Sequence, residues 1–281
     1  ADVPAPARVV FRNLTIAGGK PTNQEMHAAG AEGGGMAIYR GEWQGGGDTV
    51  LERVVIRDNV AEYGAGIFLR GGITIRDSAI VGNRARDLGF PPAPGNPPCS
   101  RWIAGGGIYM SLDSGRPNVD TRLIERTLIA ENQALYQCNE DEWEGYGWYG
   151  GALVSYATLV NVTISDNYST GVVGGISING VGLIHVTIAG NRAERETGGI
   201  DIGGFRTNVL FGTIVADNYA PEDPDCTFSG LEVWVSEGYN LLEQPGSCAS
   251  GRYHDPPNQD TDILGEDALL LPLGDYGGPT Q

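Results

Sequence analysis

Residues 162–176, with the sequence VTISDNYSTGVVGGI, carry a pattern that returns along most of the chain. In this stretch Ile164 stands three residues before Asn167, and a glycine pair leads into Ile176. The chain is therefore a repeat array, so the repeat decides the domain count in place of the length of 281 residues. The same pairing of an aliphatic residue with an asparagine recurs at Ile56 and Asn59, Ile80 and Asn83, Ile129 and Asn132, Ile188 and Asn191, and Val215 and Asn218.

The repeat predicts short strands and turns. Its smallest period is 24 residues, from Asn59 to Asn83 and from Asn167 to Asn191, and its segments are β-branched and separated by Gly, Asn and Asp. Strands of this kind stack about 4.8 Å apart, coil on coil. We expect an all-β protein, a right-handed parallel β-helix of about seven or more coils, with loop insertions on one face and an irregular C-terminal segment.

The repeat also suggests how the chain is divided. We expect β-helix coils over residues 1–221 and a disulfide-closed segment packed on the helix over residues 222–281. Insertions in a solenoid project from one face, which is the usual place for a binding surface. Such insertions interrupt the coils at residues 21–32, 86–104 and 135–149.

The row of asparagines has a structural explanation. Identical amides one coil apart can hydrogen-bond to the amides above and below them. We therefore predict a structural ladder, without a catalytic role, formed by Asn59, Asn83, Asn132, Asn167, Asn191 and Asn218.

The charge and the cysteine content limit the binding partners and the cellular location that we expect. The formal charge of −17, from 35 acidic and 18 basic residues, disfavours binding to nucleic acid or to anionic lipid, because their phosphate groups would be repelled. The uncharged run over residues 145–165 contains glycines and hydroxyl groups and fits the repeat, so we predict no membrane span. Four cysteines, in a chain that begins Ala-Asp-Val-Pro, predict an extracellular or cell-surface location. An extracellular glycan or neighbouring copies of the chain are the expected partners.

The repeat resembles the pectate-lyase-like β-helix group. The tail resembles bacterial choice-of-anchor Q surface proteins through Pro224-Asp-Cys226, Gly238-Tyr-Asn-Leu241, Cys248 and the ending LPLGDYGGPTQ over residues 271–281. This resemblance implies a bacterial surface protein built on a β-helix. It also implies a disulfide between Cys226 and Cys248, which would close the final insertion.

A second disulfide follows from the insertions. Residues 86–104 and 135–149 leave the same corner of consecutive coils, so their roots should lie about 4.8 Å apart. That spacing is within the Cα separation that a disulfide accepts. We therefore expect Cys99 to bond to Cys138.

The same two insertions are rich in aromatic residues. Flat rings stack on sugar rings, and neighbouring carboxylates accept hydrogen bonds from hydroxyl groups, so we predict a sugar-binding face. The alternative is that these rings only pack the loops against the helix. The predicted ligand-binding residues are Trp102, Trp143, Tyr146, Trp148 and Tyr149.

Catalysis is the alternative use of these loops. A hydrolase needs two carboxyl groups about 5 to 9.5 Å apart, and a lyase needs Ca²⁺ and a base. The Gly-His-Gly motif of polygalacturonase-like hydrolases is absent, and His185 occupies a repeat position that Arg53 and Asn161 fill elsewhere. The weak catalytic candidates are Glu140, Asp141, Glu142, Glu144 and Arg101, and the weak metal candidates are Asp113, Asn118 and Asp120.

These observations favour a non-catalytic protein. We expect a structural, adhesive or glycan-binding β-helix that can self-associate through its coil ends. It requires no cofactor, and its acidic loops can bind Ca²⁺. The alternative is a polysaccharide lyase or glycoside hydrolase that acts on an extracellular polysaccharide.

Overall fold

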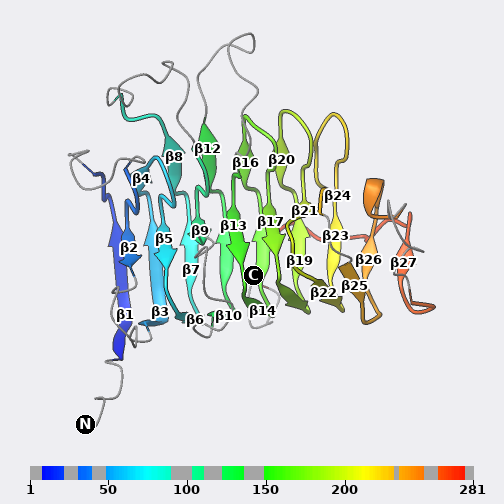
Figure 1. Cartoon of the computed structure of the whole chain (residues 1–281), viewed down its shortest axis with the longest axis horizontal. Helices are drawn as coiled ribbons and strands as arrows, with labels where there is room; N and C mark the ends of the chain where they lie inside the picture. The colour runs from blue at the N-terminus through cyan, green and yellow to red at the C-terminus, as the bar shows by residue number, and fades with distance from the viewer. Residues whose placement is uncertain are drawn as a thin grey trace.

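The computed structural model describes residues 8–21, 31–39, 49–89, 103–110, 122–135, 149–230, 234–249 and 259–275. These residues form three parallel sheets and no α-helix, with one 3-10 turn, η2, at Gly246–Cys248. The predicted parallel β-helix is confirmed. Its coils stack along the long axis of the molecule, from β1 at the left of Figure 1 to β27 at the right.

Two of the sheets are narrow faces of the coil. The seven-stranded sheet consists of β2 (Met36–Tyr39), β5 (Ile67–Arg70), β9 (Ile108–Met110), β13 (Ala152–Ser155), β17 (Ile176–Asn179), β21 (Ile200–Ile202) and β24 (Cys226–Phe228). The five-stranded sheet consists of β4 (Val60–Ala61), β8 (Arg84–Arg86), β12 (Gln133–Leu135), β16 (Tyr168–Ser169) and β20 (Arg192–Ala193).

The third sheet has two arms that meet at β3 (Thr49–Arg57), which also pairs with β1 (Val9–Ala17). One arm contains β6 (Ile73–Arg76), β10 (Arg122–Glu125), β14 (Thr158–Val160), β18 (Gly182–Ile184), β22 (Asn208–Phe211) and β25 (Trp234–Ser236). The other contains β7 (Ala79–Val81), β11 (Leu128–Ala130), β15 (Thr163–Ser165), β19 (Thr187–Ala189), β23 (Ile214–Ala216), β26 (Leu241–Leu242) and β27 (Ile263–Leu264).

The corner between the two arms explains the position of His185. Residues at this corner take the left-handed backbone conformation, with φ of 54° at Arg53, 51° at Asn161 and 53° at His185. Unlike side chains share this geometry, so the position turns the chain and does not select for imidazole. His185 instead packs on Phe211, with ring centroids 5.2 Å apart.

Alternate residues of the strands point into the coil, and most of them form one large apolar core. The five-stranded sheet contributes Ala61, Ala85 and Ala134 to a smaller, separate cluster. In the seven-stranded sheet Ile67, Ile108, Ile176 and Ile200 occupy the same register and are fully buried. Burial of such side chains contributes about 1.5–3 kcal/mol each. The outward residues of the same strands are therefore free to vary, because the core does not constrain them.

The predicted asparagine ladder is present and almost fully buried. Each Nδ2 donates to the Oδ1 of the asparagine in the next coil, at 2.9 Å from Asn59 to Asn83 and 3.0 Å from Asn132 to Asn167. The last rung differs, because Asn218 donates to the Oδ1 of Asp225 at 2.9 Å. The ladder thus ends on a carboxylate that the repeat pattern did not reveal.

Residues after the last repeat continue the helix. Strand β24 extends the seven-stranded sheet, and β25, β26 and β27 extend the arms of the third sheet. The Cys226–Cys248 disulfide is confirmed, with Cα atoms 5.8 Å apart, and it ties β24 to η2. Cys99 and Cys138 lie outside the described residues. The roots of their insertions are neighbours, because Arg86 of β8 pairs with Leu135 of β12.

A membrane span is not seen in the described part of the chain, where no helix is long and apolar enough to cross a bilayer.

Candidate functional site

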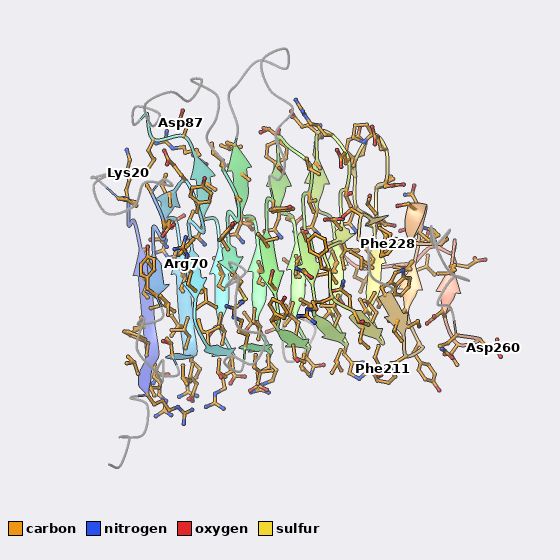
Figure 2. All side chains as sticks on the ribbon, in the orientation of Figure 1. Lys20, Arg70, Asp87, Phe211, Phe228 and Asp260 are labelled. Carbon is orange, nitrogen blue, oxygen red and sulfur yellow. A yellow bond between two sulfur atoms is a disulfide. The ribbon has the colours of Figure 1, made fainter. Side chains whose placement is uncertain are left out.

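A hollow of about 330 Å³ opens on the outer face of the seven-stranded sheet. Its lining comes from β9, β13, β17 and β21 and from the turns beside them, and includes Tyr109, Tyr149, Ser177, Asp201 and Phe205. Figure 2 shows the side chains on the strands of this sheet between the labelled Arg70 of β5 and Phe228 of β24. This volume lies at the lower end of the range for small-molecule pockets.

The hollow follows from a change of residue type along one outward row. Neighbouring strands place Phe68, Tyr109, Leu153, Ser177 and Asp201 in the same register. Large rings fill the row over β5 and β9, whereas a small serine follows on β17. A recess therefore forms where the large side chains end.

The aromatic wall of the hollow is held in place by stacking. The ring of Tyr109 lies 5.5 Å from that of Phe68, with 4° between the ring planes, and 5.7 Å from that of Tyr63 in an edge-on arrangement. The guanidinium of Arg70 lies over the Phe68 ring, 5.2 Å from its centroid. Such contacts are worth about 0.5–1.5 kcal/mol each. Tyr109 is thus a rigid surface for a ligand.

Tyr149 forms another wall and comes from the end of the insertion at residues 135–149. It pairs with Val173 in a parallel bridge, which fixes its backbone beside β17. Burial, and then the negative charge of Asp201, raise the pKa of the Tyr149 hydroxyl, whereas a hydrogen bond with Ser177 opposes this shift. The phenol therefore stays protonated at neutral pH and can hydrogen-bond to a ligand.

Asp201 is the chemical centre of the hollow. Ser177 Oγ donates to its Oδ2 at 2.8 Å, and Ser229 Oγ donates to its Oδ1 at 2.5 Å. Burial raises the pKa of the carboxyl, and the two hydroxyl hydrogen bonds only partly oppose this. Among the described residues, no cationic side chain forms an ion pair with Asp201.

The surroundings of Asp201 are also negative. Partial burial, followed by the charges of Glu222, Asp201 and Asp223, raises the pKa of Glu196, whereas the charge of Arg195 lowers it. One end of the hollow is thus electronegative. Within the part of the chain that the structure describes, no group of three or more His, Cys, Asp or Glu side chains could hold a metal ion.

The predicted site residues are divided by what the structure describes. Tyr149 lines the hollow, and its role in sugar binding stays a prediction. The remaining candidates lie outside the described residues: Trp102, Trp143, Tyr146 and Trp148 for ligand binding; Glu140, Asp141, Glu142, Glu144 and Arg101 for catalysis; and Asp113, Asn118 and Asp120 for metal binding.

Sequence reasoning missed Tyr109, Ser177 and Asp201. The signal for Asp201 is present in the stretch GGIDI over residues 198–202, where a carboxylate stands at the outward position of a strand. Other copies place Ala37 or Phe68 at this position. Asp201 can be recognised in the sequence only if the outward positions of the strands are assigned, because it lies in a strand and not in an insertion.

A larger hollow of about 650 Å³ lies elsewhere, between residues 269–274 and the arm that contains β15 and β19. Leu269 and Leu271 are strongly exposed on its outer side. Its lining also includes Thr163, Thr187 and Asp217. This second hollow contains no buried carboxyl group, so it lacks the chemical centre of the first.

No family model matches the chain, and comparisons with curated proteins and with solved structures find no match.

Proposed function

We propose that this protein is a secreted or cell-surface β-helix that binds a glycan in the hollow on the seven-stranded sheet. The observation that carries the proposal is the pairing of stacked aromatic walls with the buried Asp201 carboxylate. A sugar has an apolar face and a rim of hydroxyl groups, so it suits a site with one wall of rings and another of hydrogen-bond acceptors.

Three features support the assignment. Phe205 is 67% exposed at the rim, where a ring can stack on a ligand without first leaving the core. Asn179 offers an amide beside it, and its Oδ1 accepts from the backbone N–H of Phe205 at 3.2 Å. The aromatic-rich insertion at residues 135–149 ends at Tyr149, inside the hollow. The site therefore combines rigid walls with an accessible edge.

The test is a binding measurement with a matched pair of variants. Isothermal titration with neutral and charged oligosaccharides should detect binding, and Phe205→Ala should weaken it roughly two- to tenfold, because one ring contact is lost. The control is Tyr219→Ala, which removes another exposed aromatic ring, one stacked on Arg192. Its affinity should equal that of the parent chain.

The outcome that contradicts the proposal is equally direct. Equal affinity in the Phe205→Ala and Tyr219→Ala variants would exclude the hollow as the binding site. The absence of binding to every oligosaccharide in a broad panel would exclude the proposed function itself.

A second candidate, a glycoside hydrolase, is favoured by the raised pKa values of Asp201 and Glu196. A carboxyl group whose pKa is raised by burial can give its proton to the leaving-group oxygen, while a second carboxylate takes a proton from the attacking water. Incubation with polysaccharides, followed by assay of reducing ends and of unsaturated products, tests this. Turnover that falls at least roughly 100-fold in Asp201→Asn would establish the enzyme, and no turnover would eliminate it.

A further inference from the structure

We infer, building on the proposed function, that the glycan bound in the hollow is positively charged: an amino-sugar oligosaccharide whose ammonium group pairs with Asp201. The resemblance to pectate-lyase-like proteins would instead lead to anionic uronic acids. The charges around this hollow point the other way.

The first argument is the missing countercharge of Asp201. Its side chain is buried and receives hydrogen bonds from the neutral Ser177 and Ser229. A buried carboxylate is costly unless a cation accompanies it, and the described residues place no basic side chain against it. A carboxylate has about four acceptor sites, so two remain for an incoming ammonium group.

The second argument is the field at this end of the hollow. The charges of Glu196 and Asp201 both raise the pKa of the Tyr149 hydroxyl, and the charges of Glu222 and Asp223 raise the pKa of Glu196 against the opposing charge of Arg195. These groups lie on a chain of net charge −17. A uronate would be repelled here, a neutral sugar tolerated and an ammonium attracted.

The third argument concerns the kind of cation. Calcium takes six to eight oxygen ligands, whereas the described residues form no cluster of three or more His, Cys, Asp or Glu side chains that could hold a metal. The hollow is also much larger than a single ion, at about 330 Å³, and two of its walls are the rings of Tyr109 and Tyr149. An organic cation with an apolar face fits these walls.

The experiment compares four probes by isothermal titration of the whole chain: a glucosamine tetramer, the N-acetylglucosamine tetramer, a galacturonate tetramer and calcium chloride. The pH is set where the amine is charged. We expect the glucosamine tetramer to bind about tenfold or more tightly than its N-acetylated counterpart, because a hydrogen bond to a charged group is strong. We expect no measurable heat from the galacturonate tetramer.

Two variants locate the effect. Asp201→Asn keeps the side-chain shape and removes the charge, and Asp201→Ser introduces the residue that β17 carries in the same register. Circular dichroism checks that each variant is folded. In either variant the affinity for the glucosamine tetramer should fall to that for the N-acetylated tetramer. Asp217→Asn removes one charge from the other hollow and should leave the preference unchanged.

The outcomes separate this inference from the proposed function. If the N-acetylated or galacturonate tetramer binds as tightly as the glucosamine tetramer, and Phe205→Ala weakens that binding, the hollow is a glycan site but the charge preference is overturned. A glucosamine preference that survives both Asp201 variants overturns it too, as does calcium binding that competes with the glucosamine tetramer at Asp201. No binding by any tetramer overturns both proposals.

Discussion

Asp225 shows how a single residue ends a repeating network. Its Oδ1 accepts from the backbone N–H and the Nδ2 of Asn218, at 3.1 and 2.9 Å, and its Oδ2 accepts from the backbone N–H of Gln244 at 2.8 Å. All three partners are donors, so the position needs an acceptor on both oxygens. The asparagine side chain that occupies every earlier rung has only one acceptor oxygen.

This geometry predicts that Asp225→Asn destabilises the protein although it matches the shape of the ladder residues. The new amide N–H₂ would face the Gln244 N–H, and an unsatisfied buried donor costs about 1–3 kcal/mol. Urea denaturation measures the change in the free energy of unfolding. Asp217→Asn, at an exposed position, is the control and should lie near the parent value; a similar result for Asp225→Asn would show that the ladder relaxes at its end.

Asp201 predicts a pH dependence of stability. Its pKa is raised in the folded protein by burial, so its contribution to stability is fully present below the unfolded pKa of about 3.9 and is lost as pH rises through the folded value. Asp201→Asn does not ionise, so its stability relative to the parent chain should increase between acid and neutral pH. Thermal unfolding across this range checks the trend, and a constant difference would contradict it.

At the scale of elements, the outward row of the seven-stranded sheet decides where a ligand can bind. Inward positions of β9, β17 and β21 all carry isoleucine at one register, whereas the outward positions between them carry Tyr109, Ser177 and Asp201. The strands themselves are interchangeable as core elements. Their outward residues are what make this stretch of the sheet different from the rest.

The disulfide between β24 and η2 carries an element-scale prediction. It closes a loop with a sequence separation of 22 between Cys226 and Cys248. A loop of this length corresponds to about 3 kcal/mol of unfolded-state entropy, so the double variant Cys226→Ala/Cys248→Ala should lose at least that much stability in urea. Reductant should reduce the difference in the free energy of unfolding between the variant and the parent chain to the contribution of sulfur packing alone. If reductant leaves this difference unchanged, the whole effect comes from packing.

At the scale of the molecule, a solenoid distributes its stability from coil to coil. Central strands such as β13 and β17 have a coil on each side, whereas β1 pairs with β3 alone among the described strands and exposes Val9 and Val10. Amide hydrogen exchange should therefore be slowest in β13 and β17 and fastest in β1 and β27. Uniform protection would indicate one cooperative unit instead.

The same measurement addresses self-association through the coil ends, which stays a prediction. If copies stack end to end, the protection of β1 should increase with protein concentration while that of β17 stays constant. Sedimentation of the chain at the same concentrations provides an independent reading, and a monomer throughout would contradict stacking.

The sequence was sufficient to predict the β-helix, the asparagine ladder and the Cys226–Cys248 disulfide. The disulfide follows from the resemblance of the tail, whereas the β-helix and the ladder follow from a fixed period: Asn59 and Asn83 occupy equivalent places in successive coils, and stacking brings them together. The hollow was not predictable in this way. It brings together Tyr109, Tyr149 and Asp201, whose side chains share a surface only once the coils are wound and the outward direction of each strand is set. The position of Asp225 was not predictable either. It is not part of the repeat, and only folding places its carboxylate beside Asn218.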